Sequence, residues 1–572
     1  MMNVRLPLRS AWLCLGLTIL LAVPSFAASP SSGSISAGSL ETTWTGSGLG
    51  LPTASATCGG PNNAKCDNFQ LVLSAPSYSF SLEITATPKA VDDYDLEVYN
   101  AAGQLVGSST NGPGSVEKVT LNNPSSGTYT VSTSNFLALL GYTGKAKIVA
   151  NGSSGTGSAN LGFAVYAAPA GVGDSSGEPS VGVNWNTDEV MYIAGLETLR
   201  VSFNDCVTPA QATWQDKSYV TTSLLTLDPI LFTDPVTGRT LVSQLAGLCS
   251  SMAFSDNDGD SWLPSMGCGI NSGVDHQSVG GGPFAPPLTG LLGYPHAVYY
   301  CSQDVAIAQC ALSLNGGLTF GPAVPIYNLT QCGGLHGHVK VGPDGAAYVP
   351  NKNCNGEQGV AVSENNGLTW TVRHVSGTSA GTWDPSVGVA SDGTVYIGMT
   401  YGGRPYAAVS HDKGQTWTNL QEIGTQFGIQ NTAFPVVVAG DGDRAAVGFL
   451  GSSQGGDGSG TDPNSNHVWY PYVALTTDGG QTWTTVNVSP NDPVQRGNVC
   501  SLGTTCSAAR NLLDFNDIAV DSDGHIIFAY ADGCVGSCVS AAPNSSAAKA
   551  IIARQTTGPR LFAAYDGTSS CP

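Results

Sequence analysis

Acidic, histidine and amide side chains recur at comparable intervals along the second two thirds of this chain. They are Glu178, Asp228, Asp275, His276, His336, His338, Asp384, Asn431, Asn516 and Asp517. Carboxyl and imidazole groups gathered around one axis could exchange protons with a substrate or hold a divalent cation. Each residue taken alone can equally be a turn or strand-entry residue, so the chemistry depends on whether the fold brings them together.

Three roles are predicted for this set and its neighbours. The catalytic candidates are Glu178, Asp228, Asp275, His276, His338, Asp384 and Asp517. Trp383, Tyr401 and Arg404 are expected to bind substrate. His336 and His338 would lie on one face of a strand, where they could bind a metal or transfer a proton, with a pair of satisfied histidines as the alternative.

A repeated motif predicts the β-sheet elements that must position these residues. It reads Ser410-x-Asp412-x-Gly414-x-Thr416-Trp417, and related copies begin at Ser255, Ser313, Ser363 and Thr476. The intervals are 58, 50, 47 and 66 residues, which is the period of one propeller blade. Asp or Asn suits a tight turn, Gly supplies a positive φ, and the aromatic side chain packs between blades.

The five copies resemble the Asp-box (BNR repeat) family of sialidase-like β-propellers. This resemblance implies four-stranded antiparallel blades, with the motif at an outer turn away from the central pocket. Asp-Gly turns recur between the expected first and second strands, as at Pro343-Asp344-Gly345 and Ser391-Asp392-Gly393. Counting by these turns, blades begin near Glu178, Asp228, His276, His338, Asp384, Asn431 and Asn516. We expect seven blades, with six as the alternative.

Exo-sialidases of that family carry an Arg-Ile/Leu-Pro motif in the first blade, three arginines that bind the sialate carboxylate, a Tyr–Glu nucleophile pair and an acid/base Asp. Here the first blade opens with Gly177-Glu178-Pro179, so an acid stands where the first arginine is expected. The remaining candidate arginines are Arg239, Arg404, Arg444, Arg496 and Arg510, and none lies in a comparable motif. An acidic pocket mouth would repel sialic acid, so a typical exo-sialidase activity is not expected.

The preceding region, residues 44–166, shows short alternating strand patterns separated by Gly, Pro and Asn turns. Asp92-Asp93-Tyr94-Asp95, followed by Gly103 and by Pro124-Ser125-Ser126-Gly127, resembles the bacterial pre-peptidase C-terminal type β-sandwich, an accessory or binding module. Asp93 and Asp95 are candidate Ca²⁺ ligands, and a solvated strand start is the alternative.

The whole chain is therefore predicted to be all-β. The expected divisions are a signal peptide (1–27), a flexible leader (28–43), a β-sandwich (44–166), a linker (167–177), a β-propeller (178–565) and a tail (566–572). The Gly-rich insertion at 452–466 is expected to be an exposed loop between two strands of one blade.

Export is indicated by the N-terminus and by the cysteines. Arg5 and Arg9 precede a 13-residue apolar stretch that is too short to span a bilayer, and Ser25-Phe26-Ala27 suits cleavage. Removal of this segment leaves 14 cysteines, an even number that suits disulfides in an oxidising compartment. The closest pairs are Cys58/Cys66, Cys301/Cys310, Cys332/Cys354, Cys500/Cys506 and Cys534/Cys538.

Charge limits the partners. The mature chain has 19 basic and 41 acidic residues, a net charge near −22, which argues against nucleic acid and anionic membranes. We expect a secreted monomer without membrane insertion or an organic cofactor, and with Ca²⁺ or another divalent cation as a candidate ligand. Its partner would be an extracellular polysaccharide or glycoconjugate.

A glycoside hydrolase needs two carboxylates about 5–9 Å apart. A polysaccharide lyase needs a base such as His276 or His338, with Tyr294 as a helper. A non-catalytic binding or adhesion propeller is the other alternative.

Overall fold

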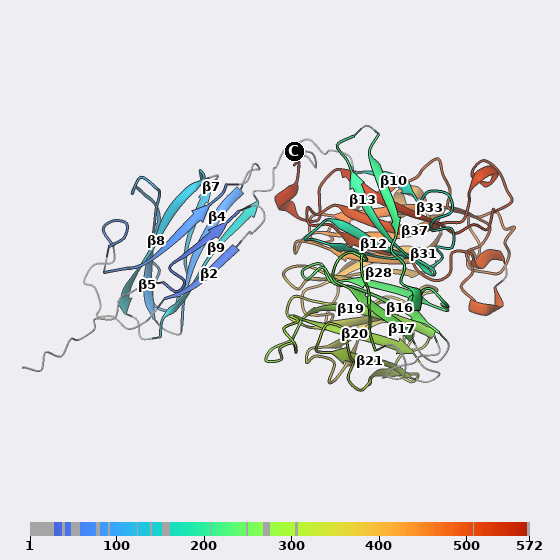
Figure 1. Ribbon diagram of the computed structural model, residues 1–572, viewed down its shortest axis with the longest axis horizontal. Coiled ribbons are helices and arrows are strands. Elements are labelled where there is room, and N and C mark those ends of the chain that lie inside the picture. The colour runs from blue at the N-terminus through green and yellow to red at the C-terminus, as the bar shows by residue number, and fades with distance from the viewer. Residues whose placement is uncertain are drawn as a thin grey trace, which may run out of the picture. The chain divides into compact units, whose positions relative to one another are not determined.

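The computed structural model describes residues 28–568 except 37–40, 47–57, 64, 76–79, 90–91, 123, 138–139, 151–160, 208, 247–249, 267–274, 304–306 and 507. The chain divides into two compact units, residues 1–153 and 154–572. Both are built from β-sheets that are antiparallel apart from one parallel strand pair in the N-terminal unit, and Figure 1 shows the strands of each. The described residues add only short 3₁₀ helices, at Val220–Thr222, Thr425–Phe427, Gly503–Thr505, Ala508–Arg510, Gly536–Val539 and Ala563–Tyr565.

Two sheets form the N-terminal unit. One has the order β1 (Ser32–Ile35), β3 (Asp67–Leu73), β8 (Gly127–Leu137), β5 (Asp93–Tyr99) and β6 (Leu105–Ser109). The other has the order β2 (Glu41–Gly46), β9 (Tyr142–Ala150), β4 (Phe80–Pro88) and β7 (Glu117–Asn122). Their apolar faces share one core, in which Trp44 stacks on Phe69 with ring centroids 3.9 Å apart. The expectation of a flexible leader over 28–43 is wrong, because β1 and β2 pair within these sheets and bury Ile35 and Trp44.

Seven four-stranded sheets form the second unit, which is the predicted seven-bladed propeller. Blade 1 consists of β11 (Ser180–Asn184), β12 (Glu189–Ala194), β13 (Glu197–Asn204) and β14 (Gln211–Asp216). Blade 2 consists of β15 (Pro229–Thr233), β16 (Thr240–Leu245), β17 (Ser250–Ser255) and β18 (Leu263–Pro264). Blade 3 consists of β19 (Asp275–Pro283), β20 (His296–Gln303), β21 (Ile307–Ser313) and β22 (Val324–Asn328).

Blade 4 consists of β23 (Lys340–Val341), β24 (Ala347–Cys354), β25 (Glu357–Ser363) and β26 (Thr371–Val375). Blade 5 consists of β27 (Ser386–Val389), β28 (Val395–Tyr401), β29 (Arg404–Ser410) and β30 (Thr418–Glu422). Blade 6 consists of β31 (Asn431–Ala439), β32 (Ala445–Ser452), β33 (Val468–Thr476) and β34 (Thr484–Asn487). The short β35 (Gln495–Arg496) also pairs with β33. The first strands of successive blades pack side by side, and β36 of blade 7 packs against β11 to close the ring.

Blade 7 is completed by a strand from far away in the sequence. Its order is β36 (Asp517–Val520), β37 (Ile526–Asp532), β38 (Lys549–Thr557) and β10 (Gly162–Ala167). The sequence placed 162–166 at the end of the sandwich and 167 at the start of the linker, and this assignment is wrong. The alternating pattern of β10 correctly predicts a strand. Its pairing with β38 arises only when the ring of blades closes, and no local sequence pattern encodes that pairing.

The five repeated motifs make the same turn between the third and fourth strands of blades 2 to 6. In blade 5, the Gly414 backbone N–H donates to Ser410 Oγ at 2.7 Å, and the Thr416 N–H donates to Asp412 Oδ1 at 2.8 Å. Gly414 has φ of +87°. The same two hydrogen bonds recur in the other four turns. The motif residues therefore have a structural role at each turn.

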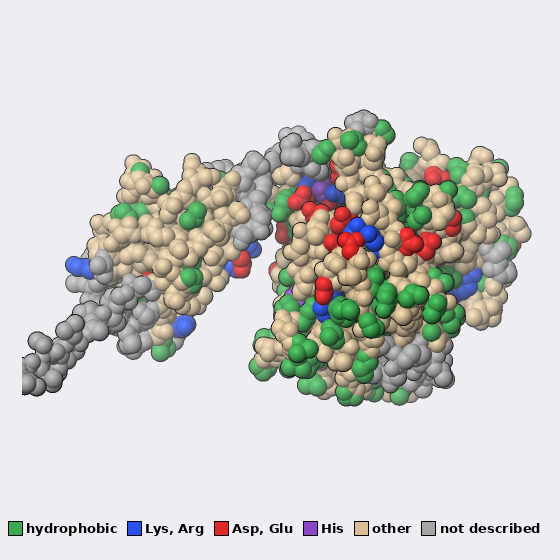
Figure 2. Space-filling view, in the orientation of Figure 1, with side chains coloured by type: hydrophobic (Ala, Val, Ile, Leu, Met, Phe, Trp, Pro, Cys, Tyr) green, Lys and Arg blue, Asp and Glu red, His purple; other side chains and the backbone are tan. Residues whose placement is uncertain are grey.

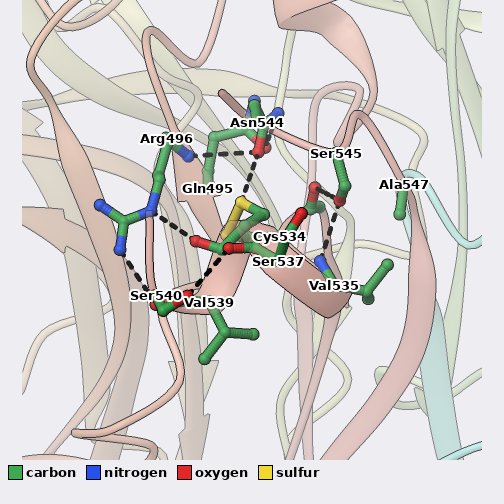
Figure 3. The surroundings of a disulfide bond; sticks show 12 residues. Gln495, Arg496, Cys534, Val535, Ser537, Val539, Ser540, Asn544, Ser545 and Ala547 are labelled. Atoms are coloured by element: carbon green, nitrogen blue, oxygen red, sulfur yellow. Dashed lines mark hydrogen bonds between the residues drawn. A yellow bond between two sulfur atoms is a disulfide. The ribbon is translucent and has the colours of Figure 1, made fainter. Parts of the chain in front are cut away.

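All five predicted cysteine pairs form disulfides: Cys58–Cys66, Cys301–Cys310, Cys332–Cys354, Cys500–Cys506 and Cys534–Cys538. Around the last of these, the Arg496 guanidinium donates from Nε to Cys538 O at 2.6 Å and from Nη2 to Val539 O at 3.0 Å (Figure 3).

Five disulfides indicate an oxidising compartment, outside the cell or in a periplasm. The predicted signal peptide, residues 1–27, lies outside the described residues. Among the helices that the structure does describe, none has the length and apolar character needed to cross a bilayer.

Charged side chains are sparse, at 11% of the chain. On the face shown in Figure 2, most of the surface is uncharged polar side chain or backbone, and the basic groups are scattered, some of them beside acidic ones, without forming a continuous patch. The face in view therefore shows no basic stripe of the kind that binds a nucleic-acid backbone.

Candidate active site

Residues from three blades meet where the innermost strands begin, and we call His276, His336, Lys352 and Asp384 the axial cluster. The imidazole Nε2 of His276 lies 3.4 Å from Asp384 Oδ2, and Lys352 Nζ lies 3.4 Å from Asp384 Oδ1. The His336 ring centroid is 6.1 Å from that of His276. His276 and Asp384 are almost entirely buried, whereas the Lys352 side chain is 24% exposed. The fold therefore brings together two predicted catalytic residues and one predicted metal ligand.

Phe515, two residues before the first strand of blade 7, lies against two histidines. Its ring centroid is 4.8 Å from that of His276 and 4.5 Å from that of His338. His338 lines a cavity of about 210 Å³ that runs between the first strands of all seven blades. Sequence reasoning passed over Phe515, since an aromatic residue at a strand entry is ordinary core material, and only the position of blade 7 places it between the imidazoles.

The charges in the axial cluster support one another. Burial disfavours a charged imidazole, yet the Asp384 carboxylate raises the pKa of His276 above its ordinary value, with a smaller contribution from Asp228. Burial also opposes ionisation of Asp384, but Lys352 and then His276 hold its pKa below the usual range. The pair is therefore an imidazolium and a carboxylate over a range of acidic to neutral pH.

The other two histidines are neutral. Burial and the nearby His276 lower the pKa of His336 to about 4. Burial and then Lys340 lower the pKa of His338 well below its ordinary value. His336 Nδ1 donates to Gly337 O at 2.9 Å, which leaves Nε2 as the acceptor nitrogen. The predicted placement of both histidines on one strand does not occur, because β23 begins only at Lys340 and His336 makes an isolated bridge to Asn351.

Two predicted catalytic carboxylates join neighbouring blades. Asp228 Oδ2 accepts from the Gln277 N–H at 2.6 Å. Asp517 Oδ2 accepts from the Val181 N–H at 2.9 Å and from Ser180 Oγ at 3.0 Å. Serines play the same part elsewhere, where the N–H groups of Val339 and Val437 donate to Ser278 Oγ and Ser386 Oγ. These hydrogen bonds account for acidic residues at both positions without invoking catalysis.

The remaining predicted catalytic residues are dispersed. Glu178 is buried with φ of +60°, and its backbone N–H donates to Leu512 O. Asp275 begins β19, and its side chain lies outside the described residues. Tyr294 does not join the axial cluster: its hydroxyl donates to Asp234 Oδ2 at 2.8 Å, beside the turn between β15 and β16.

The predicted substrate-binding residues lie in blade 5 or directly before it. Trp383 is buried against Phe434 with centroids 4.6 Å apart. Tyr401 stacks on Tyr406 at 4.1 Å, and Arg404 pairs with Glu422 at 3.1 Å. Trp383 also lines a second cavity, of about 260 Å³, between blades 5 and 6. Sequence reasoning named neither this cavity nor Lys352, because both depend on which strand ends share one side of the propeller.

The candidate metal ligands Asp93 and Asp95 lie on β5 of the N-terminal unit, in a group of buried carboxylates. Burial and the nearby Glu117, Asp93 and Glu97 raise the pKa of Asp95 to about 6. Across the described part of the chain, no three His, Cys, Asp or Glu side chains are arranged to hold a metal ion. The structure thus offers acidic groups at the predicted place but no assembled coordination sphere among the residues it describes.

The fold and the axial cluster define the chain as a seven-bladed β-propeller protein. No known family profile matches it, and no curated protein matches it in sequence. Among solved structures, it is similar to the Hadza microbial sialidase Hz136, with 13% identity, a TM-score of 0.34, and coverage of 85% of this chain and 94% of that one. It is also similar to the Niastella koreensis GH74 enzyme (14% identity, TM-score 0.40, 67% and 55% covered). The ulvan lyase of polysaccharide lyase family PL25 gives 11% identity, a TM-score of 0.35, and coverage of 66% and 93%. At these values the matches say nothing of this chain's own activity, and the fold rests on the seven sheets themselves.

Proposed function

We propose that this chain is a secreted enzyme that cleaves extracellular glycans at the axial cluster. The observation that carries the proposal is the buried His276–Asp384 pair with Lys352 beside it, at the point where the innermost strands begin. A buried imidazolium oriented by a carboxylate can donate a proton to a leaving oxygen and recover it afterwards. Secretion is supported by the five disulfides and by the sequence of residues 1–27.

Hydrolysis of a glycosidic bond is the reaction that we favour. Asp384 and, more weakly, Asp228 raise the pKa of His276, so a second carboxylate lies within electrostatic range of the imidazole in addition to its structural hydrogen bond to Gln277. A hydrolase needs two such acids on either side of the bond that it breaks. Elimination from a uronate is the alternative reaction, because Lys352 could neutralise the substrate carboxylate while a neutral imidazole takes the proton.

Exo-sialidase activity is not proposed, because the candidate arginines are engaged elsewhere. Four of them form ion pairs: Arg239 with Asp256, Arg404 with Glu422, Arg444 with Asp566, and Arg510 with Asp514. The fifth, Arg496, donates a hydrogen bond to Cys538 O. An arginine held by its own partner is a poor ligand for a sialate carboxylate.

The test is cleavage by the mature protein of a panel of polysaccharides that includes sialosides, with and without EDTA. We expect His276→Gln and Asp384→Asn to lower kcat by about 100-fold or more on the cleaved polymer. Asp392→Asn is the matched control, because Asp392 lies in an exposed turn of the same blade. Thermal unfolding shows whether each variant is folded. Full activity of folded His276 and Asp384 variants would refute the proposal, and loss of activity in EDTA would add a divalent cation.

A non-catalytic glycan-binding propeller is the second candidate. It is favoured by the near-complete burial of His276 and Asp384 and by the structural hydrogen bonds of Asp228 and Asp517. Retention of the protein on one polysaccharide in affinity electrophoresis, without turnover of any, would establish this function instead.

A further inference from the structure

The cavity between blades 5 and 6 is separate from the axial cluster, although Trp383 on its wall directly precedes Asp384. Its volume of about 260 Å³ is far more than one water molecule needs. The wall comes from the loop before β27, the end of β28, the start of β31 and the loop between β32 and β33. Trp383 and Trp469, both almost fully buried, form part of it.

Asn431 fixes the loop that borders this cavity. Its Nδ2 donates to Gln454 O at 2.8 Å and to Gly456 O at 3.0 Å, and its Oδ1 accepts from the Gly458 N–H at 3.1 Å. The loop is held from its other side by backbone hydrogen bonds from Val499 and Ser501. The Gly-rich insertion is, as predicted, a largely exposed loop between two strands of one blade, and its hydrogen bonds hold defined groups at the cavity.

Asp457 is the acidic group that this loop presents. Its Oδ1 accepts from the Ser459 N–H at 2.8 Å and from Ser459 Oγ at 2.6 Å. These two hydrogen bonds orient the carboxylate and leave Oδ2 without a hydrogen-bond partner among the described residues. A carboxylate oxygen held in this way can accept hydrogen bonds from the hydroxyl groups of a ligand.

The rest of the lining is uncharged and rich in hydroxyl and amide groups. It includes Thr382, Gln430 and Ser459, and no Lys, Arg or His is among the lining residues. Thr400 and Thr432 also line the cavity, and their buried hydroxyls have no hydrogen-bond partner within the described structure. A buried hydroxyl without a partner costs stability, which is a reason to look for a ligand or an ordered water that satisfies it.

This composition selects the class of ligand. An anionic group would meet the Asp457 carboxylate and no cation, which is unfavourable. A hydrophobic ligand would strip water from hydroxyl and amide groups without replacing their hydrogen bonds. A polyhydroxylated ring offers donors for the carboxylate, donors and acceptors for the amides, and apolar C–H faces for indole rings.

We propose that the cavity between blades 5 and 6 binds a neutral sugar residue. The site selects neutral over acidic sugars through Asp457 and the absence of a cation among its lining residues. The proposal rests on the proposed function in taking a glycan as the ligand, and it names the kind of sugar unit that the axial cluster alone leaves open. Trp383 in the lining and Asp384 in the axial cluster are consecutive, so the two sites adjoin along the chain.

The experiment is isothermal titration of the mature protein with two sets of sugars at millimolar concentration. The neutral set is D-glucose, D-galactose, D-mannose, L-rhamnose and N-acetyl-D-glucosamine, with a disaccharide of each hexose. The acidic set is D-glucuronate and N-acetylneuraminate. We expect at least one neutral sugar to bind and both acidic sugars to fail. Binding of an acidic sugar alone, or of no sugar in either set, would overturn the proposal.

Variants then locate the binding. Asp457→Asn and Thr432→Val should each weaken binding of the neutral sugar by about tenfold. The first removes a charged acceptor at the exposed rim of the cavity, and the second removes a buried hydroxyl. Asp462→Asn is the matched control, because Asp462 lies in the same loop but outside the lining. Unchanged affinity in both cavity variants would refute the site.

The outcome is separable from that of the proposed function. Asp384→Asn and His276→Gln should leave the affinity of the neutral sugar unchanged while they lower kcat by about 100-fold or more. Thr432→Val should also raise the unfolding temperature in the absence of sugar, because it removes an unpaired buried hydroxyl. Loss of binding in the axial variants but not in the cavity variants would place the sugar at the axis and refute this inference.

Discussion

The Nε2 of His276 lies 3.4 Å from Oδ2 of Asp384, and the two side chains come from blades that are not consecutive. Blade 4, which separates blades 3 and 5, contributes Lys352 to the same carboxylate. The pair therefore forms only when the blades are arranged around a common axis. It also couples the charge state of the candidate site to the stability of the propeller.

The free energy of unfolding should depend on pH through this pair. The raised pKa of His276 stabilises the fold fully below about pH 6.5, and this contribution is lost as the pH rises through the folded-state pKa. The lowered pKa of Asp384 stabilises it above about pH 3.9, and this contribution is lost as the pH falls through the folded-state pKa.

Asp384→Asn should therefore destabilise the protein most between about pH 4 and pH 6.5, by about 3 kcal/mol. Urea unfolding of the wild type and the variant at pH 5 and at pH 9 measures the difference. Asp392→Asn serves as the control. An equal loss at both pH values would contradict a pH-dependent charge pairing between Asp384 and His276.

The repeated turns should each contribute to stability. Ser410→Ala leaves the buried Gly414 N–H without its acceptor at 2.7 Å and should cost about 1–3 kcal/mol. Ser391→Ala, in an exposed turn of the same blade, should change stability by less than about 0.5 kcal/mol. Denaturant unfolding of both variants makes the comparison, and equal effects would contradict a structural role for the motif serine.

Closure of the propeller by β10 predicts a sharp truncation boundary. A chain beginning at residue 161 keeps β10 and should fold, whereas one beginning at residue 168 leaves the edge of β38 unpaired and should aggregate or unfold at lower temperature. Size-exclusion chromatography and thermal unfolding distinguish the two. Equal stability of both chains would show that blade 7 is complete with three strands.

The acidic group of the N-terminal unit should destabilise that unit when it is ionised. The pKa of Asp95 is raised to about 6, so its folded form binds a proton more tightly than the unfolded chain does, and stability falls as the pH rises from about 4 to 6. In EDTA, Asp95→Asn should stabilise the unit by about 1–2 kcal/mol at pH 7 and by almost nothing at pH 4. If Asp93 and Asp95 hold Ca²⁺, added Ca²⁺ should stabilise the wild type and not the variant.

Several features of the chain follow from local sequence, because their causes act over a few residues. The turn at Asp412 and Gly414 is specified by side-chain-to-backbone hydrogen bonds within five residues, so five copies predict five turns and hence a propeller. Period-two alternation marks the strands between the turns, and the blade count followed from both. Cysteines such as Cys301 and Cys310, which lie opposite each other on a hairpin, pair because the hairpin brings them together.

Only the tertiary structure decided which of the polar residues act together. Asp228, Asp384 and Asp517 look alike in sequence, yet Asp517 bonds to the strand of the next blade while Asp384 meets an imidazole and an ammonium group. The partner of β10 and the cavity bordered by Asp457 likewise depend on contacts between segments far apart in the chain. The physical reason is that hydrogen-bond geometry and strand period act within a segment, whereas burial and charge pairing act between segments and exist only once the ring has closed.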